Sequence, residues 1–384
     1  MPVFVASAKA PVNIATLKYW GKRDTKLNLP TNSSISVTLS TDDLAAYTTA
    51  TASPAYKDDS LVLNGIPEPI EQSARLSACL RELRALRAAL EQADSSLPPL
   101  SSYHVHVFSK NNFPTAAGLA SSAAGFAALV RAVANLFELP QSPEELSRIA
   151  RQGSGSACRS LMGGFVGWEM GSKDDGSDSL AVQIAPKSHW PTIKAAILVI
   201  SAQKKDISST SGMQTTVKTS SLFQHRIQNV VPRRYEEMKN AILNHDFELF
   251  ATLTMADSNQ FHAVCLDSMP PIFYMNDASR QAIRAVEELN RAAGKTIAAY
   301  TFDAGPNCVI YYQQEDEQAV LGLLRTAVPD ADKWTSTNAS ASLLHGYNTE
   351  LLAGLDNAVT QVILTSIGDA PVSTEEHLDF PPVE

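Results

Sequence analysis

The chain has 384 residues, which is enough for two ordinary domains around a shared cleft or for one large domain. Hydrophobic residues make up 44% and charged residues 18%, a composition typical of a globular protein with a sizeable core. The formal net charge of −9 excludes the overall basic balance of a nucleic-acid-binding protein, and it makes local clusters of lysine and arginine informative.

The cysteines and the N-terminus indicate the cellular setting. Cys79, Cys158, Cys265 and Cys308 are widely spaced and form no CxxC pair, which argues against a disulfide framework or a zinc site. The N-terminus lacks the basic start and apolar stretch of a signal peptide, and no apolar run is long enough to span a bilayer. We therefore expect a cytoplasmic protein with reduced thiols.

The first hundred residues predict a strand and a long helix. Residues 34–39 alternate between polar and apolar side chains, which predicts a half-buried strand. Leucines at helical spacing predict a helix over residues 76–93. Arg81, Arg84 and Arg87 recur every third residue on this helix, and we expect them to form a solvated face.

A strand, a loop and two helices are predicted next. Residues 105–109 predict a short strand, 111–118 a loop, and 121–139 an alanine-rich, closely packed helix. Ser142-Pro143-Glu144-Glu145 combines a cap serine, a proline at the first helical position and a glutamate three residues after the cap. These residues are a strong start signal for a further helix, which is expected to run to about Arg151.

The second half of the chain begins at a continuous apolar strand over residues 195–201, and we place a domain boundary just before it. The predicted domains are residues 1–190 and 191–384. Further elements of the second domain are helices around 224–245, 247–261 and 277–293 and paired strands at 298–302 and 308–312. Because strands and helices mix without strict alternation, an α+β fold is favoured over a doubly wound sheet.

A glycine- and serine-rich loop between a strand and a helix is the first candidate ligand site. It extends from Pro114 to Ala123. A phosphate group requires backbone N–H donors, close approach and the positive end of a helix dipole. Gly118 would allow the close approach, and Ser121 and Ser122 would add hydroxyl groups. The loop is not a Walker A motif, and a glycine-containing turn with serine caps is the structural alternative.

Two further segments could bind anions in this acidic chain. Lys18 and Lys22 are four residues apart, so a helical turn would place both ammonium groups on one side. Residues 153–159 contain two Gly-Ser steps, which expose backbone donors, and Arg159, whose planar fork suits a carboxylate or a phosphate. An ordinary surface and a helix-breaking linker are the respective alternatives. Two such segments together fit two phosphorylated ligands.

These segments resemble a known family. Residues 114–123 resemble the P-x-x-x-G-L-x-S-S-A loop of the GHMP family of small-molecule kinases. Segments 10–40, 111–126, 153–164 and 302–307 together resemble one branch of it, the mevalonate diphosphate decarboxylases, and fungal members above all. The similarity includes Asp257-Ser258-Asn259, and it weakens after Asp316 apart from residues 362–365. The segment 334–354 departs from the family pattern.

The resemblance implies a two-domain GHMP-type α+β fold, with the active site in the cleft between the domains and usually a homodimer. It implies a carboxy-lyase of the mevalonate pathway of isoprenoid and sterol biosynthesis. Such an enzyme converts (R)-5-diphosphomevalonate and ATP to isopentenyl diphosphate, ADP, phosphate and CO2, with Mg²⁺ as cofactor. A substrate that carries a diphosphate and a carboxylate accounts for localised lysine and arginine in an acidic protein.

The resemblance also implies roles for individual residues. Asp303 would deprotonate the 3-hydroxyl group as it attacks the γ-phosphate. Arg159 would keep Asp303 ionised and Lys18 would stabilise the transferring phosphate. The implied substrate contacts are Tyr19, Trp20, Gly21, Lys22, Arg75, Ser154, Gly155, Ser156, Ala157, Cys158, Arg159 and Thr210. The implied ATP contacts are Pro114, Ala117, Gly118, Leu119, Ala120, Ser121 and Ser122, and Ser122 would also ligate the metal.

Two other functions compete with this interpretation. A GHMP kinase that stops at phosphorylation would share the phosphate loop, but residues 19–22 and 154–159 suit the decarboxylase. A non-enzymatic ligand sensor with the same fold would be favoured by loss of Asp303, Lys18 or Arg159, and all three are present. No role is expected for a nucleic acid or a membrane.

Overall fold

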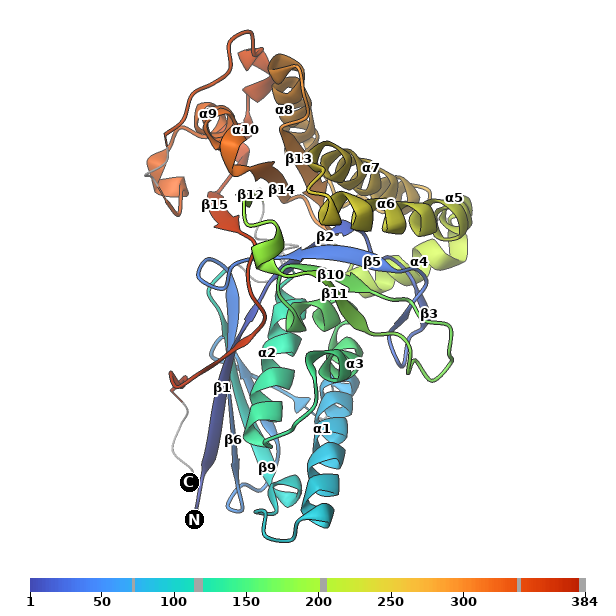
Figure 1. The fold of residues 1–384 in the computed structure, drawn as a ribbon, viewed down its shortest axis with the longest axis vertical. Coiled ribbons are helices and arrows are strands. Elements are labelled where there is room, and N and C mark those ends of the chain that lie inside the picture. Colours follow the sequence, from blue (N-terminus) through green and yellow to red (C-terminus); the bar gives the residue numbers. More distant parts are fainter. Residues whose placement is uncertain (71–72, 114–119, 201–205, 337–339, 380–384) are drawn as a thin grey trace.

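The computed structural model describes residues 1–70, 73–113, 120–200, 206–336 and 340–379. Within these ranges the chain forms an α+β fold of stacked sheets and helices, as predicted (Figure 1). Residues 114–119, which include most of the predicted phosphate loop, lie outside the described residues.

The first sheet forms one end of the molecule (Figure 1). In the described part of the chain its strand order is β16-β1-β6-β9-β7-β8, and only the β7–β9 pair is parallel. Its strands are β1 (Phe4–Pro11), β6 (Ala45–Ser53), β7 (Ser60–Leu63), β8 (Ile66–Glu68), β9 (His104–Asn111) and β16 (Val372–Thr374).

Helix α2 (Ser121–Leu136) packs on one face of this sheet, and α1 (Ala74–Ala93) and α3 (Pro143–Gly153) pack against α2 and against each other (Figure 1). The alanines of α2 at positions 123, 124, 127 and 128 are completely buried, so the helix packs closely on β1 and β6. The start signal of α3 is confirmed, because the Ser142 hydroxyl accepts the Glu145 amide while the Glu145 carboxylate accepts the Ser142 amide.

A middle sheet lies between the first sheet and the helices of the second half. Its described order is β11-β10-β5-β2. The strands are β2 (Asn13–Leu17), β5 (Ser34–Thr38), β10 (Phe165–Trp168) and β11 (Ala181–Ala185). Strand β5 was predicted to be half-buried, but all five of its residues are buried. The 3₁₀ segment η3 (Gly155–Leu161) packs on one face of the sheet and α6 (Val231–Leu243) on the other, so the polar face of the strand is covered as well.

A third sheet has the described order β13-β14-β12-β15. Its strands are β12 (Ile193–Val199), β13 (Ala298–Phe302), β14 (Cys308–Gln313) and β15 (Gln361–Ser366). Ile193, Ala195 and Ile197 face the core shared with the first half, whereas Ala196 and Leu198 face α8 (Asp277–Ala293) and α9 (Glu317–Ala327). Burial on both faces explains the continuous apolar sequence of β12.

The remaining helices lie beside the middle and third sheets. The predicted helix around 224–245 contains a π-turn, η5. Pro232, in the first turn of α6 that follows, lacks the N–H that would continue the α-helical pattern. The helices beside these two sheets that have not yet been given bounds are α4 (Ser209–Thr219), α5 (Ser221–His225), η5 (Arg226–Val230), α7 (Phe247–Leu266) and α10 (Leu355–Ala358). A short hairpin is formed by β3 (Lys22–Asp24) and β4 (Leu29–Pro30).

The prediction of a solvated arginine face on α1 is wrong for Arg87, and Arg84 is half-buried and paired with Asp59. Arg81 is exposed, but the side chain of Arg87 is completely buried and donates to the carbonyl oxygens of Phe137 and Pro98 and to Glu91. Residues three apart are rotated by about 300° on an α-helix, so two such steps carry the third arginine away from the first. A period of three therefore does not keep all three side chains on one face.

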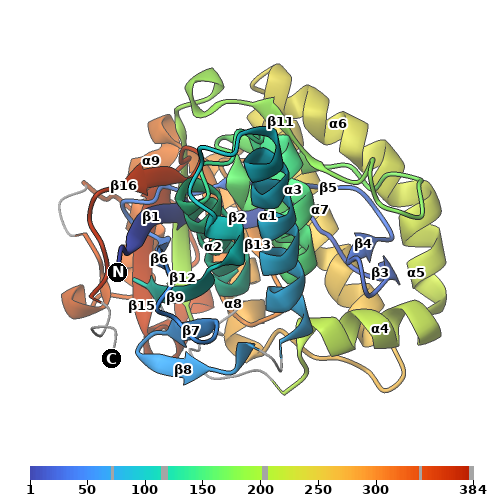
Figure 2. The same ribbon diagram turned by 90° about the horizontal axis from the view of Figure 1, so that it is seen from below.

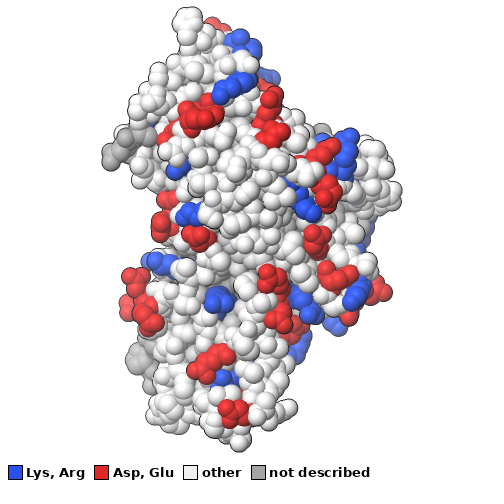
Figure 3. All heavy atoms as spheres, viewed as in Figure 1, with Lys and Arg blue, Asp and Glu red and all other residues white. Residues whose placement is uncertain are grey.

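The chain crosses back to the first sheet near its end. After β15, strand β16 pairs with β1, so the described chain ends beside the strand with which it begins (Figures 1 and 2). Basic and acidic side chains are interspersed over the face shown in Figure 3. Among the described residues, no helix is both long and apolar enough to cross a membrane.

Candidate active site

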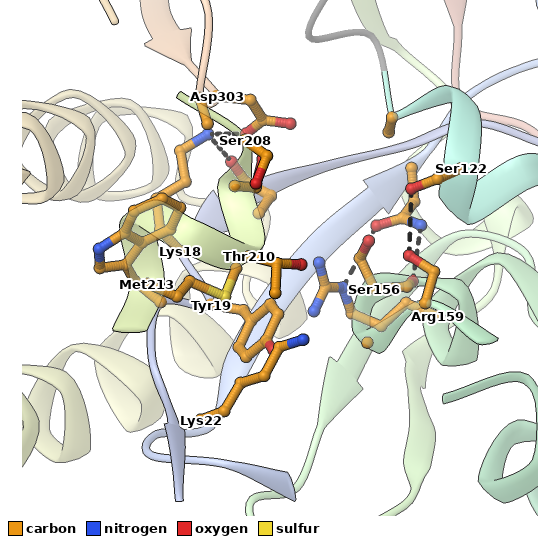
Figure 4. Close-up of a pocket in the computed structure, with 18 of the residues that line it drawn as sticks. Lys18, Tyr19, Lys22, Ser122, Ser156, Arg159, Ser208, Thr210, Met213 and Asp303 are labelled. Carbon is orange, nitrogen blue, oxygen red and sulfur yellow. Dashed lines mark hydrogen bonds and ion pairs between the residues drawn. The ribbon is translucent and has the colours of Figure 1, made fainter. Parts of the chain in front are cut away.

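A cavity of about 340 Å³ lies where the middle sheet meets α2, α4, α7 and the β13–β14 turn (Figure 4). Most of the described residues predicted for substrate and ATP line it. They are Lys18, Tyr19, Trp20, Lys22, Arg75, Ala120, Ser121, Ser122, Ser154, Gly155, Ser156, Arg159, Thr210 and Asp303. The fold therefore gathers side chains from both halves of the sequence around one space.

Lys18 and Asp303 form an ion pair in this cavity. The Lys18 ammonium group donates to the Asp303 carboxylate at 2.7 Å and to the Ala15 carbonyl oxygen at 2.7 Å. Their side chains are 3% and 26% exposed, so the lysine is enclosed while the aspartate remains accessible from the cavity. Asp303 follows β13 directly, at the start of a turn in which the Gly305 amide donates to its carbonyl oxygen.

Arg159 lies in η3 beneath the middle sheet and is 2% exposed. Its guanidinium group donates to the hydroxyl oxygens of Ser34 and Ser36 at 2.6 and 2.9 Å, and to the Asn13 amide oxygen at 3.2 Å. Burial lowers the pKa of Arg159, although arginine stays charged in proteins. These acceptors are neutral, so the positive charge of Arg159 is available to an anion in the cavity.

The wall beside Arg159 is aromatic. The Tyr19 ring lies 4.6 Å from the Trp168 ring, and its hydroxyl group has no hydrogen-bond partner among the described residues. Trp20 is buried and donates through Nε1 to Thr216 at 3.0 Å. Burial raises the pKa of Tyr19, so its hydroxyl is a neutral donor for a ligand. Gly155 lies so close to this wall that an added Cβ would be 2.9 Å from the Tyr19 ring.

The segment from Lys18 to Lys22 is not the helical turn considered from the spacing. Strand β2 ends at Leu17 and β3 begins at Lys22, with Gly21 at φ +91° between them. A side chain at Gly21 would also meet Phe223 and Thr31 at 2.6 Å. Both lysines still reach the cavity, because the irregular segment bends around it rather than coiling (Figure 4).

Lys22 and Arg75 provide positive charge at the other end of the cavity. Lys22 donates to the Asn28 amide oxygen at 2.7 Å, and Arg75 donates to the Thr210 hydroxyl at 3.0 Å. Burial, with a smaller contribution from Arg75, lowers the pKa of Lys22 to about 8. Among the described residues, the acceptor that each cation contacts is neutral, so both positive charges are available to an anionic ligand.

Three of the predicted substrate contacts do not line the cavity. Gly21 lies behind it, and Ala157 and Cys158 are completely buried within η3. The Cys158 thiol donates to the Gly155 carbonyl oxygen at 3.1 Å, and burial raises its pKa to about 12. Any contact of these residues with a ligand would require a rearrangement, and their assignment stays a prediction.

The described part of the phosphate loop meets the cavity at the N-terminus of α2. Ala120 has the left-handed φ of 53°, and Ser121 and Ser122 form the first turn of the helix. The Ser122 and Ser154 hydroxyl groups, both in the cavity lining, are 3.2 Å apart. Pro114, Ala117, Gly118 and Leu119 lie outside the described residues. A helix N-terminus of this kind favours an anion.

The described residues contain no cluster of three or more His, Cys, Asp or Glu side chains that could hold a metal ion. Mg²⁺ commonly takes only one or two protein ligands, together with water and substrate phosphates. Among the described lining residues Asp303 carries the one carboxylate, and with the hydroxyl of Ser122 it fits an ion that arrives with a nucleotide rather than one in a cage of protein ligands.

The structure adds residues that the sequence did not single out. Asn13 lines the cavity, accepts from Arg159 and donates to Ser160 at 2.7 Å. Ser208 and Ser209 line it at the start of α4, a helix that was not predicted. Asp257, noted only as part of the family resemblance, is completely buried and accepts the Lys18 amide at 2.7 Å. Asp257 and Lys18 are more than two hundred residues apart, so no local sequence pattern could have predicted this contact.

The fold and this cavity define a two-domain α+β protein of the GHMP kinase type with its site at the junction of the two halves. Two family models cover most of the chain. The diphosphomevalonate decarboxylase-like N-terminal domain matches residues 10–181, and the mevalonate 5-diphosphate decarboxylase C-terminal domain matches residues 195–374. The chain belongs to the mevalonate diphosphate decarboxylase family.

Curated relatives and solved structures agree with this assignment. The diphosphomevalonate decarboxylase of Saccharomyces cerevisiae is 57% identical over 387 residues, covering 98% of each chain. A solved mevalonate 5-diphosphate decarboxylase is 56% identical with a TM-score of 0.89, covering 98% of each chain. The Trypanosoma brucei enzyme is 35% identical with a TM-score of 0.90, covering 98% of this chain and all of the other. The resemblance to fungal members is confirmed.

A solved complex links the family to its ligands. MDDEF in complex with MVAPP, AMPPCP and magnesium is 32% identical to this chain, with a TM-score of 0.76. The match covers 98% of this chain and 100% of the other.

Proposed function

We propose that this chain uses ATP and Mg²⁺ to convert (R)-5-diphosphomevalonate to isopentenyl diphosphate, ADP, phosphate and CO2. Membership of the decarboxylase family and the ligands of the solved complex support this function. The observation that carries it is the Lys18–Asp303 pair, at 2.7 Å, in a cavity whose described lining also holds three other cations and several hydroxyl groups beside its apolar residues. One carboxylate among positive charges is the arrangement expected for a base acting on an anionic substrate.

Asp303 is the proposed base. Its carboxylate takes the proton of the tertiary 3-hydroxyl group while that oxygen attacks the γ-phosphorus of ATP and ADP leaves. Lys18 lies within hydrogen-bond distance of Asp303 and would stabilise negative charge on the transferring phosphoryl group. The 3-phosphate then leaves with its bonding electrons, and the electron pair of the bond to the carboxylate forms the alkene as CO2 departs.

Arg159 is proposed to bind the carboxylate of the substrate and to keep Asp303 ionised. Its fixed hydrogen bonds to Ser34, Ser36 and Asn13 orient the guanidinium group before a ligand arrives. A planar fork in a fixed orientation can pair with a carboxylate through two parallel hydrogen bonds. The carboxylate would be released as neutral CO2, so this charge pairing holds the substrate only until the bond breaks.

The diphosphate of the substrate is proposed to lie among Tyr19, Lys22, Arg75, Ser154, Ser156 and Thr210. These residues combine two cations with hydroxyl donors, which suits several phosphate oxygens. We propose that ATP binds along residues 114–122, with its phosphates at the N-terminus of α2. The Ser122 hydroxyl is the proposed protein ligand of Mg²⁺, which would supply positive charge to the phosphates of ATP.

The organisation of the whole protein is proposed on separate grounds. We propose domains at residues 1–190 and 191–384, with β16 returning to the first sheet; the separate family models at 10–181 and 195–374 support a division in this region.

Four buried free cysteines suit the reducing environment of the cytoplasm. A homodimer is proposed from the family resemblance, and light scattering on the purified protein tests it.

One assay tests the proposed activity. Purified protein is supplied with diphosphomevalonate, ATP and Mg²⁺, and both ADP and CO2 are measured. We expect one CO2 for each ADP. ADP release without CO2 would show that the chain is a kinase that stops at phosphorylation, and release of neither would exclude both functions.

A further inference from the structure

We propose that Asp257 and Arg226 are positioning residues for the reaction, because together they fix the backbone of Lys18 and so direct its ammonium group to Asp303. Neither residue lines the cavity, so they act through Lys18 rather than on the substrate. The kinetic part of this inference rests on the proposed decarboxylation, whereas its structural part can be measured without turnover.

Both polar backbone groups of Lys18 are bound by this pair. The Lys18 amide donates to the Asp257 carboxylate at 2.7 Å, and the Lys18 carbonyl oxygen accepts from the Arg226 guanidinium at 3.2 Å. Asn32 donates to the same carbonyl oxygen at 3.0 Å. Lys18 lies just after the end of β2, where no neighbouring strand supplies these hydrogen bonds. Its backbone position therefore depends on side chains that come from α7 and η5.

The ion pair between Arg226 and Asp257 is completely buried and has two parallel hydrogen bonds. Arg226 donates to the two Asp257 carboxylate oxygens at 2.8 and 2.9 Å, and both side chains are 0% exposed. Arg234 adds a third donor at 3.0 Å. Burial opposes ionisation, but Arg226, Arg234 and the Lys18 amide more than offset it and hold the pKa of Asp257 below its ordinary value.

A buried ion pair is weak support for stability alone, because desolvation offsets much of the attraction between its charges. Such a pair can nevertheless fix a particular conformation. Here the conformation that it fixes places the ammonium group of Lys18 2.7 Å from Asp303.

The same helix also fixes the chain on the other side of the ion pair. Ser258, the residue after Asp257 on α7, accepts the amide of Phe302 at 3.0 Å. Phe302 directly precedes Asp303. Two adjacent side chains of one helix turn thus hold the backbone at Lys18 and the backbone next to Asp303, which sets the distance between the two charged groups.

Arg226 begins the π-turn η5, between α5 and α6. π-turns are rare and frequently mark functional sites, because they redirect one side chain relative to a regular helix. Pro232 favours this departure from the α-helix, and Arg226 at its start contacts both Asp257 and Lys18.

A matched control exists in the first half of the chain. Asp59 accepts two hydrogen bonds from Arg84, at 2.8 and 2.5 Å, and one from the amide of Val105 at 2.8 Å. This arrangement repeats the carboxylate, the bidentate arginine and a backbone amide donor, but it lies outside the cavity lining. The variant Asp59→Asn therefore removes the same kind of interaction without touching the reacting groups.

The experiment compares Asp257→Asn with Asp59→Asn in the full chain. We expect Asp257→Asn to lower kcat about a hundredfold while the KM values for ATP and diphosphomevalonate stay close to those of the unchanged protein. Asp59→Asn should leave both parameters unchanged, although it lowers the melting temperature. Hydrogen exchange followed by mass spectrometry should show faster exchange at the Lys18 amide in Asp257→Asn and at the Val105 amide in Asp59→Asn.

Arg226→Lys provides a second variant should Asp257→Asn not fold. It keeps a charge opposite Asp257 but loses the parallel hydrogen bonds and the bond to the Lys18 carbonyl, so kcat should fall about tenfold. Wild-type kcat in the folded variants, or a rise in KM without a fall in kcat, would overturn the positioning role. Absence of CO2 release by the unchanged protein would instead refute the proposed function, and the exchange result would still decide whether Asp257 fixes Lys18.

Discussion

The two ends of the cavity are built differently. At the reaction end, defined by Lys18 and Asp303, the ammonium group has two hydrogen bonds and the backbone is bound by Asp257 and Arg226. At the binding end, defined by Lys22, Arg75 and Thr210, the side-chain hydrogen bond that each cation makes with a described residue has a neutral acceptor. The reaction end is organised before a ligand arrives, whereas the binding end keeps its charge for the ligand.

This difference follows from the chemistry that each end is proposed to perform. A base and a charge that act on a transition state must already be in place, because reorganisation during the reaction would raise the barrier. A site binds a diphosphate more tightly when its positive charges are not already paired with carboxylates. The comparison predicts that substitutions at the reaction end change kcat and substitutions at the binding end change KM.

Asp303→Asn should have the largest effect. Asparagine keeps the size of the side chain but cannot accept the proton of the hydroxyl group, so kcat should fall by about 10³-fold. ATP affinity should be retained, because the proposed ATP site lies at residues 114–122. Steady-state kinetics and calorimetric titration with ATP measure the two quantities. Substantial residual turnover would remove Asp303 from the role of base.

Arg159→Lys should have the next largest effect, a loss of about a hundredfold in kcat/KM. Lysine keeps the charge, but it cannot reproduce the planar fork or donate to Ser34, Ser36 and Asn13 together. Initial rates over a range of diphosphomevalonate concentrations measure the loss. Near-normal rates would show that charge alone suffices at this position, contrary to the proposed pairing with the carboxylate.

Lys22 should make substrate binding depend on pH. Burial and Arg75 lower its pKa to about 8, so the ammonium charge is present below pH 8 and lost above it. KM for diphosphomevalonate should therefore rise as the pH passes above about 8. In Lys22→Arg the rise should disappear, because arginine stays charged. A wild-type KM that is flat across this range would show that Lys22 does not bind the diphosphate.

Arg75→Gln should have the smallest effect. The side chain of Arg75 is exposed, so its attraction for the diphosphate is screened by solvent and salt, and KM should rise only about threefold. The increase should shrink at high ionic strength. The variant also removes a positive charge beside Lys22, which should move the pH-dependent rise in KM to higher pH. A salt-independent effect would indicate a packing role instead.

Local signals in the sequence predicted much of the fold. The capping box at Ser142 and the alanine-rich pattern of α2 act within one helix, so they can be read from neighbouring residues. Helix α4 was missed because its Ser- and Thr-rich sequence has a low helix propensity, and Ser208 caps it by accepting the Ser211 amide. The burial of β5 and Arg87 depends on what packs above them, which no local pattern records.

The sequence predicted only part of the site, because some of its contacts join residues that lie far apart in the chain. The family motifs pointed to Lys18, Arg159 and Asp303, which the fold brings into one cavity. Asp257 and Arg226 were not given a role, because their partner Lys18 lies far away in the sequence. The roles implied for residues 114–119 lie outside the described part of the chain and stay predictions.

The measurement that tests this account most directly compares the kinetics of Asp303→Asn and Lys22→Met below pH 8. We predict that Asp303→Asn loses kcat with an unchanged KM for diphosphomevalonate. Lys22→Met should raise that KM about thirtyfold, equivalent to about 2 kcal/mol for a hydrogen bond to a charged group, with kcat nearly unchanged. If both variants changed the same parameter, the division of the cavity into a reaction end and a binding end would be wrong.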